Sequence, residues 1–311
     1  MEKKRQDEYP KTRWGILLAI VAVVIIIGAA FIGMLVSLFD SPNPGLLGKS
    51  NVALIKIEGP ILTGKESFFE PVASSSEIMG FIEEASEDSG IDAIILEINS
   101  PGGSAVASDE IVSSISKVKK PKISFIREVG ASGAYWVAAS TDYIIANRLS
   151  ITGSVGVISS YLEFAGLLRD YNVTYRRLVA GKYKDIGDPF RELTNPEEAI
   201  LQQQLDEVHS IFLSDVAEKR RLTQAQTAEI STGLFFIGAK AKELGLVDEL
   251  GGKEEAVAYL ENKFNASVNI IEYKKEPSFA ELFTGLLGKN SFLIGKGIGS
   301  SMVQDRVGLY I

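Results

Sequence analysis

The sequence predicts an α/β protein in which a mainly parallel sheet is built from strand–helix–strand units, preceded by one N-terminal transmembrane helix. Short apolar runs alternate along the chain with segments of helical periodicity, the pattern of right-handed βαβ units. Glycine-rich turns follow two of these runs, at residues 101–103 and 130–133. Residues 14–39 form a stretch of 26 residues without a charge, and roughly 20 apolar residues suffice to cross a bilayer.

The first fifty residues predict where the protein lies. Residues 1–13 carry five Lys and Arg side chains, so the positive-inside rule places this flank in the cytoplasm. A cleaved signal peptide is the alternative, but its apolar region is usually only about 7–15 residues long. We therefore expect a retained single-pass anchor over 14–39, a Pro/Gly/Ser-rich linker over 40–50, and an extracytoplasmic domain held at the cell membrane.

The domain predicted over residues 51–275 alternates strands and helices. The predicted strands are 52–57, 91–98, 122–129, 143–146, 155–158 and 173–179. The predicted helices are 74–87, 105–118, a short helix ending at 139, 195–221 and 239–244. Asn195 is the expected N-cap of the long helix, with Pro196 at its first position. Residues 276–311 form a C-terminal tail with weaker patterning.

Composition excludes several kinds of chemistry. The chain has no cysteine, which excludes disulfides, thiolate nucleophiles and Cys-ligated metal sites. Its one histidine is His209, so a Ser-His-Asp triad would have to use that residue. His209 falls midway along the predicted long helix, where an ordinary helix position is the simpler interpretation. The formal net charge of −8 argues against nucleic acid as a partner, because phosphate binding needs a basic face.

Two strand-to-helix turns carry the candidate chemistry. Ligands bind beyond the carboxyl ends of parallel strands, which is where residues 100–103 and 130–133 fall. Ser132 stands between glycines at a helix N-terminus, where free N–H groups and the helix dipole stabilise negative charge. Gly102 and Gly103 permit a tight turn whose N–H groups converge, as an oxyanion hole requires. The structural alternative is that Ser132 only N-caps its helix.

A serine nucleophile needs a base, and the turns offer neither a matching carboxylate nor a spare histidine. Lysine is the remaining choice, and Lys182 and Lys184 both follow the predicted strand at 173–179. A lysine base must be neutral, so burial would have to lower its pKa from about 10.4 to near 7. Spacing alone does not choose between the two lysines, and solvated loop residues are the alternative for both.

Five segments, in this order, resemble the signal peptide peptidase A family of membrane-bound Ser/Lys proteases. They are residues 99–103 (Asn-Ser-Pro-Gly-Gly), 130–135 (Gly-Ala-Ser-Gly-Ala-Tyr), 152–156 (Thr-Gly-Ser-Val-Gly), 181–184 (Gly-Lys-Tyr-Lys) and 245–251 (Gly-Leu-Val-Asp-Glu-Leu-Gly). The resemblance spans roughly residues 52–274. It implies a fold of repeated ββα and βαβ units, of the caseinolytic protease and crotonase type. The Ser-Pro-Gly-Gly segment alone would not single out this family, because it is equally similar to the wider group of proteins with these folds.

The resemblance also implies roles for individual residues. Ser132 would be the nucleophile, Lys184 the general base and Ser154 the residue that hydrogen-bonds the lysine amine. The backbone N–H groups of Gly103 and Gly133 would form the oxyanion hole. The family further implies a homo-oligomer without metal or nucleotide cofactor, acting on membrane-associated peptides that include cleaved signal peptides. Some members carry two tandem domains, so a single copy would complete its site only through oligomerisation, and whether one subunit supplies both Ser132 and Lys184 stays open.

Two other functions share the predicted fold. A crotonase-like acyl-CoA enzyme would use the same oxyanion glycines, but its substrate is cytoplasmic, whereas the anchor places this domain outside. Covalent labelling of Ser132 separates that enzyme from a peptidase. A non-catalytic membrane scaffold would keep the fold and show no activity on any peptide.

Overall fold

The computed structural model describes residues 22–30, 49–64 and 72–274 of the 311-residue chain. The chain divides into two compact units, Met1–Gly48 and Lys49–Ile311. The second unit contains the sheet and all the residues predicted to form the site.

The predicted membrane anchor falls in the first unit. Of residues 14–39, the stretch 22–30 is described, and it is helical. No helix in the described parts of the chain is long and apolar enough to cross a membrane. The rest of that span, the flank 1–13, residues 40–48 of the predicted linker and the tail 276–311 lie outside the described residues.

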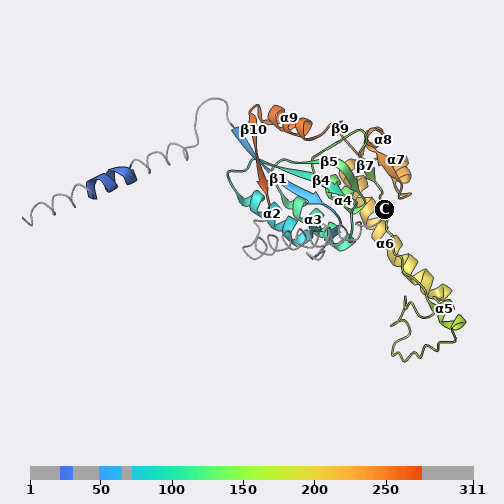
Figure 1. The fold of residues 1–311 in the computed structure, drawn as a ribbon. Helices are drawn as coiled ribbons and strands as arrows, with labels where there is room; N and C mark the ends of the chain where they lie inside the picture. The colour runs from blue at the N-terminus through green and yellow to red at the C-terminus, as the bar shows by residue number, and fades with distance from the viewer. Residues whose placement is uncertain (1–21, 31–48, 65–71, 275–311) are drawn as a thin grey trace, which may run out of the picture. The chain divides into compact units, whose positions relative to one another are not determined.

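An eight-stranded sheet forms the centre of the second unit (Figure 1). Its strands are β1 (Lys49–Glu58), β4 (Ala93–Ser100), β5 (Lys122–Ala131), β6 (Tyr143–Ala146), β7 (Ile151–Gly153), β8 (Phe235–Ile237), β9 (Glu249–Leu250) and β10 (Ser267–Tyr273). The order is β10-β1-β4-β5-β6-β9, with every pair parallel. β7 pairs in parallel with the end of β5 and antiparallel with β8. The predicted α/β fold with a parallel sheet is confirmed.

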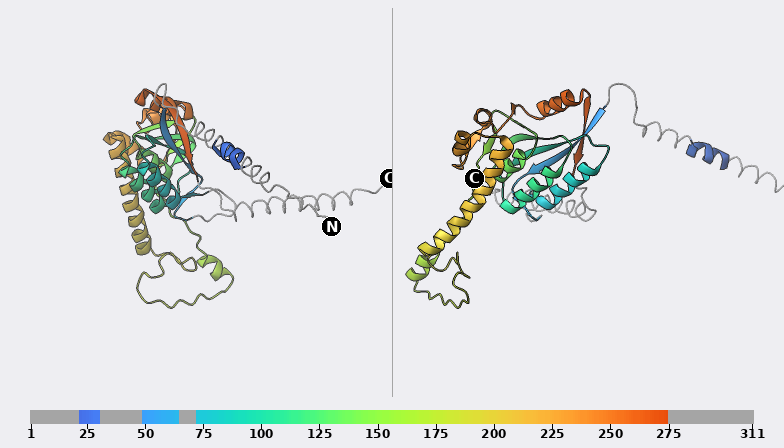
Figure 2. Two further views of the ribbon diagram at one scale, coloured as in Figure 1. Left: turned by 90° about the vertical axis from the view of Figure 1, so that its left-hand side faces the viewer. Right: turned by 180° about the vertical axis from the view of Figure 1, so that it is seen from behind.

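Helices cover both faces of this sheet (Figures 1 and 2). One face packs on α2 (Ser75–Glu87), α3 (Ala105–Lys117), α4 (Gly133–Ala139) and α6 (Asn195–Arg220), and the other on α9 (Lys253–Phe264). Along β4, Ile94 and Leu96 face the first layer, whereas Ala93 and Ile95 face α9. Because both faces are covered, the central strands are continuous apolar runs in the sequence. Shorter elements are β2 (Ile61–Leu62), β3 (Ala73–Ser74), α5 (Ala165–Asp170), α7 (Gln224–Ile230) and α8 (Gly238–Glu243).

The long helix α6 carries a projecting segment, residues 159–194, which we call the arm. α6 has 26 residues and is therefore about 39 Å long at 1.5 Å per residue. Its buried apolar residues, Phe212 and Val216, are in its C-terminal half. Figures 1 and 2 show the N-terminal half extending away from the sheet, with α5 and the rest of the arm at its far end.

Two predicted strands are absent, and the physical reason is the lack of a partner. Residues 155–158 are irregular because the strand that pairs with β5 here is β7, which ends at Gly153. Residues 173–179 lie on the arm, where no described strand is available to pair with them. The N-cap of α6 is Thr194 and not Asn195, and the Glu197 carboxylate accepts the Thr194 N–H at 3.1 Å.

Candidate active site

Ser132 lies between the last residue of β5 and the first residue of α4. Its backbone has φ 55° and ψ −129°, and its N–H donates to the Gly153 carbonyl on β7 at 2.8 Å. The Ser132 side chain makes no capping hydrogen bond to α4. The interpretation of Ser132 as a helix cap therefore has no hydrogen bond to support it, and its hydroxyl is free for other chemistry.

The backbone at Ser132 is strained. Two other non-glycine residues with positive φ, Arg221 and Asn265, have the left-handed conformation that is common at helix ends. The ψ of Ser132 lies far outside that region, and such conformations cost about 1–3 kcal/mol, a cost typical of functional sites. Every residue of α4 is buried. The packing of this helix fixes the serine despite the strain.

The loop after β4 presents Gly103 to the Ser132 turn. Ile61 donates its N–H to the Gly102 carbonyl at 2.9 Å and accepts from the Ser104 N–H at 2.8 Å. These two hydrogen bonds involve the residues on either side of Gly103, so the Gly103 N–H takes no part in the pairing with Ile61. A Cβ placed on Gly133 would lie 3.7 Å from the Gly103 nitrogen, so the two glycines are neighbours. The N–H of Gly133, in the first turn of α4, has no acceptor within its helix, and the pair is suited to binding an oxyanion.

Ser154 is also brought to this turn. Ala131 on β5 pairs with Gly153 on β7, so Ser154 follows the residue whose carbonyl binds the Ser132 N–H. Its own N–H donates to the Leu234 carbonyl at 2.9 Å, and its φ is 53°. Two serines with positive φ therefore stand next to each other at the ends of neighbouring parallel strands.

A cavity of about 260 Å³ opens beside Ser132. Its lining residues are Gly103, Ser104, Ala105, Ser132, Gly133, Trp136, Gly156, Val157, Ile158, Val208 and Phe212. The ring of Trp136 stacks on that of Phe212 with centroids 4.8 Å apart, and its Nε1–H donates to Asp215 at 3.1 Å. The cavity is therefore lined both by apolar side chains, of which the Trp136–Phe212 pair is held firmly, and by Ser132, Gly103 and Gly133.

Lys184 lies elsewhere, on the exposed arm. Its N–H donates to the Gly181 carbonyl at 3.2 Å within a turn. The arm joins α6 at Asn195, whereas the cavity contacts α6 at Val208 and Phe212, and 13 residues of helix advance about 20 Å. Figure 1 shows the arm at the end of α6 that is remote from α4. A single chain therefore brings together Gly103, Ser132, Gly133 and Ser154 but does not bring Lys184 to them.

His209 and Lys182 both have other partners. His209 Nε2 lies 3.1 Å from the Val155 carbonyl oxygen and makes no described contact with Ser132. Lys182 Nζ lies 4.8 Å from the centre of the Tyr183 ring. The hydrogen bond and charge interaction with Tyr183 raise the pKa of Lys182, which disfavours the neutral form that a base requires.

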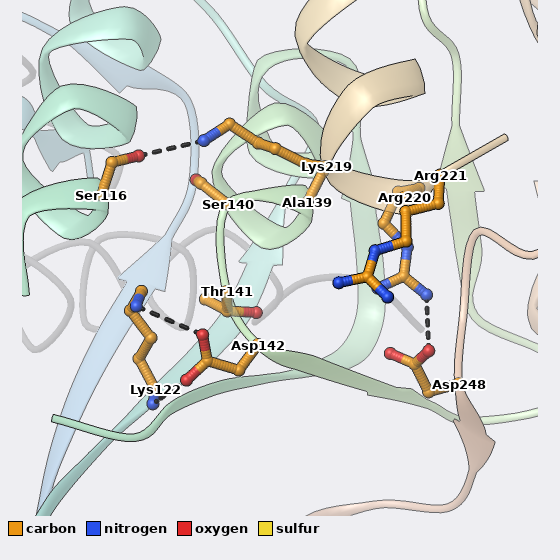
Figure 3. Close-up of a pocket in the computed structure, with 10 residues that line it drawn as sticks. All are labelled: Ser116, Lys122, Ala139, Ser140, Thr141, Asp142, Lys219, Arg220, Arg221 and Asp248. Carbon is orange, nitrogen blue, oxygen red and sulfur yellow. Dashed lines mark hydrogen bonds and ion pairs between the residues drawn. The ribbon is translucent and has the colours of Figure 1, made fainter. Parts of the chain in front are cut away.

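A larger polar cavity of about 570 Å³ lies at the opposite end of β5 (Figure 3). Three helices, α3, α4 and α6, end around it, and cations at helix C-termini are favoured by the helix dipole. Lys219 donates to Ser116 at 3.1 Å, and Arg220 pairs with Asp248 at 2.7 Å. Lys122 pairs with Asp142 at 3.2 Å. We interpret this cluster as the neutralisation of three helix ends. The Ser132 cavity is the candidate active site because it combines a serine with two neighbouring glycine N–H groups.

Comparison with known proteins identifies the family. The model described as peptidase family S49 matches residues 114–267. The chain is 34% identical over 294 residues to a putative protease of Methanocaldococcus jannaschii, which covers 91% of this chain and 92% of that protein. The chain belongs to peptidase family S49. This S49 chain is also 31% identical over 247 residues to a putative signal peptide peptidase SppA of Enterococcus faecium, covering 76% of this chain and 72% of that protein.

A solved structure shares the fold of this S49 peptidase. It is a mutant of a membrane-bound stomatin-specific protease in complex with a substrate peptide, with a TM-score of 0.50 and 17% identity. The match covers 78% of this chain and 99% of that one. At this level of identity the likeness concerns the fold alone. The family resemblance inferred from the sequence is confirmed, and the protein is a serine-type peptidase.

The S49 match favours a peptidase over an acyl-CoA enzyme or a scaffold. The matched segment includes Ser132, Ser154 and Lys184, whereas Gly103 precedes it. The individual roles of these residues remain predictions. Sequence reasoning missed the cavity wall, because Val157 and Phe212 come from segments far apart in the chain and no local motif links them to Trp136.

Proposed function

We propose that this S49 peptidase is an endopeptidase that uses a Ser132/Lys184 dyad. The observation that carries the proposal is Ser132 itself, a strained serine without a capping bond, beside two glycine N–H groups and an apolar cavity. Ser132 Oγ attacks the peptide carbonyl, and neutral Lys184 accepts its proton and passes it to the leaving amine. Water then hydrolyses the acyl-enzyme, while the N–H groups of Gly103 and Gly133 stabilise the oxyanion.

The dyad forms between two copies of the chain, with the arm of one subunit carrying Lys184 to the Ser132 of another. The exposure of the arm supports this arrangement. Its exposed large apolar side chains are Tyr161, Leu162, Leu167, Tyr171, Val173, Tyr175, Leu178, Val179, Tyr183 and Phe190. An exposed apolar surface of this kind is typical of a protein interface. Burial against a second copy also supplies the desolvation that a neutral lysine needs.

Lys184 is the better candidate for the base. Lys182 already lies over the Tyr183 ring, and its pKa is raised, so its charged form is favoured in the free arm. Lys184 has no described side-chain partner. Ser154, placed beside Ser132 by the pairing of β7 with β5, is positioned to accept a hydrogen bond from the incoming amine.

The substrates are peptides with apolar side chains, including signal peptides left after secretion. The apolar wall of Trp136, Val157 and Phe212 supports an apolar side chain next to the scissile bond. The name of the Enterococcus faecium relative supports the signal peptide class. The uncharged stretch 14–39 and its cationic flank support a single-pass anchor with the catalytic domain outside the cytoplasm.

Mixing two inactive variants tests the function and the shared site together. Ser132→Ala and Lys184→Ala should each abolish peptidase activity on an apolar signal peptide. Co-expressed in equal amounts, they should restore roughly a quarter of the activity, because random assembly pairs a serine-bearing subunit with a lysine-bearing neighbour at that frequency. Lys182→Ala and His209→Gln serve as controls and should stay active.

The outcomes separate the parts of the proposal. Activity in Ser132→Ala would remove the nucleophile assignment. Co-assembled variants that stay inactive, as shown by size and composition, would mean that the dyad does not form between chains. Activity in Lys184→Ala with its loss in His209→Gln would replace the lysine base by a histidine.

A further inference from the structure

A cluster of largely buried charged side chains joins the arm to the first turn of α6. The side chain of Arg191 is 18% exposed, and it lies between Asp185 at 13% and Glu197 at 8%. On the same arm Leu178 is fully exposed. Because charged side chains are seldom withdrawn from water unless they are paired, this cluster is a structural feature of the arm and not a chance surface contact.

Arg191 joins two segments through one guanidinium group. Nη1 and Nη2 donate to the two carboxylate oxygens of Glu197 at 2.8 and 2.6 Å. Nε donates to the Asp185 carboxylate at 3.0 Å, and Nη2 also donates to the Asp185 main-chain carbonyl at 2.9 Å. Glu197 belongs to the first turn of α6, whereas Asp185 directly follows Lys184. One side chain therefore fastens the Lys184 loop to the long helix.

Both anchoring carboxylates are themselves held in place. Glu197 Oε2 accepts from the Thr194 N–H at 3.1 Å and from its hydroxyl at 2.8 Å. Asp185 also pairs with Arg177. The Arg191 hydrogen bonds lower the pKa of Glu197 to about 2, and the Arg177 hydrogen bond does the same for Asp185. The cluster is therefore fully charged at neutral pH.

We propose that Arg191 is a positioning residue for Lys184, holding the backbone of the Lys184 turn at a fixed place on α6. The inference rests on the proposed role of Lys184 as the base. The Lys184 backbone is held by its N–H bond to the Gly181 carbonyl. It is also held through the next residue, Asp185, whose carboxylate and main-chain carbonyl both accept hydrogen bonds from Arg191. The arm is thereby preorganised before it meets the Ser132 of another subunit, which removes an ordering cost from the catalytic step.

Arginine is required for this task because of its geometry. Its planar fork donates to both Glu197 oxygens while Nε remains available to Asp185. A lysine ammonium is a point donor and cannot make the paired contact and the Asp185 contacts together. Arg191→Lys should therefore keep the charge but lose the fixed geometry.

The test measures kcat and KM separately for Arg191 variants in the assembled protein. Arg191→Gln should lower kcat about 10- to 100-fold, with KM changed less than about threefold, since a small misplacement of a catalytic group costs this much. Arg191→Lys should recover only a small part of kcat. Asp185→Asn should lower kcat in the same sense, and the double variant with Arg191→Gln should be no worse than the more affected single variant, because both remove one link.

Arg220→Gln is the matched control. Arg220 makes a similar ion pair with Asp248 at 2.7 Å, near the other end of α6 and away from the arm. This variant should lower the melting temperature but leave kcat per folded subunit unchanged. Thermal melting and native mass spectrometry of all variants show whether folding and subunit number are retained.

Each outcome decides the matter. A normal kcat in Arg191→Gln, when Lys184→Ala is inactive, would overturn the positioning role and leave the proposed function intact. Loss of subunit assembly together with activity, or an equal fall of kcat in Arg220→Gln, would assign Arg191 to general structure instead. If Lys184→Ala is itself active, the proposed base is wrong and the positioning role fails with it.

Discussion

At the scale of single residues, the site depends on backbone conformations and close approaches. Ser132 adopts φ 55° and ψ −129°, which glycine adopts without strain but serine does not. Gly103 allows the chain to pass so near Ile61 that a Cβ would lie 2.1 Å from the Ile61 carbonyl oxygen. The backbone conformation at Ser132 and the close approach at Gly103 therefore determine which substitutions these two positions tolerate.

Ser132→Gly should be inactive yet more stable than the parent protein. Glycine removes strain of about 1–3 kcal/mol and loses about 0.5–1 kcal/mol in chain entropy, so a net gain of roughly 1 kcal/mol is expected. Denaturant unfolding of Ser132→Gly against Ser132→Ala measures the gain, since alanine keeps the strain. A Ser132→Gly variant that is less stable than Ser132→Ala by about 0.5–1 kcal/mol, the entropy cost of glycine alone, would show that the serine backbone is unstrained.

Gly103→Ala should destabilise the domain by at least about 2 kcal/mol and abolish activity, because the new methyl group meets the fixed backbone of Ile61. The control is Gly80→Ala on α2, where a Cβ meets nothing within 4 Å. That change should stabilise the helix by up to about 1 kcal/mol. Thermal unfolding compares the two, and a neutral Gly103→Ala would contradict the close approach.

At the scale of elements, α6 links the cavity to the arm. Its C-terminal half packs in the core through Phe212 and Val216, and its first turn holds the arm through Glu197. The helix therefore determines the position of the arm, and with it the position of Lys184. The stability of that attachment depends on ionised Asp185 and Glu197.

The attachment should fail only in acid. Both carboxylates have a pKa near 2 in the folded arm, against about 3.9 and 4.3 when unpaired. A depressed pKa stabilises the fold above the unfolded value, and this contribution is lost as the pH falls from about 4 to 2. Hydrogen exchange of residues 177–191, corrected for intrinsic rates, should therefore show protection lost across that range. In Arg191→Gln the Glu197 pKa returns toward its unpaired value, so protection should already be weaker at neutral pH and should change less between pH 4 and 2. Profiles that coincide with those of the parent protein would contradict the pairing.

At the scale of the whole molecule, an S49 peptidase domain follows a segment whose composition suits a membrane. Four of the proposed site residues meet in one chain, while the fifth lies on a projecting arm with an exposed apolar surface. The proposed function therefore requires both assembly of several copies and their placement on one side of the membrane.

Protease added to spheroplasts should digest the domain after residue 48 while the membrane stays intact. The reason is the five Lys and Arg residues in the flank 1–13, which the positive-inside rule predicts to stay on the cytoplasmic side. Immunoblotting of the domain measures the result, with a cytoplasmic protein as the control for lysis. Full protection until detergent is added would reverse the orientation and remove secreted peptides as substrates.

The sequence by itself determined the features that depend on local patterns. Apolar runs such as 91–98 predicted the buried strands, and the glycine-rich turns predicted that Gly103 and Ser132 would end neighbouring strands, because parallel strands bring their carboxyl ends to one edge. Only the tertiary structure decided the rest. Residues 173–179 have a strand pattern but no partner to pair with, and Phe212 joins Trp136 across a long separation in the chain. The place of Lys184 is also non-local, because the ion pairs of Arg191 and the length of α6 set it, and neither is encoded in the spacing of the loop.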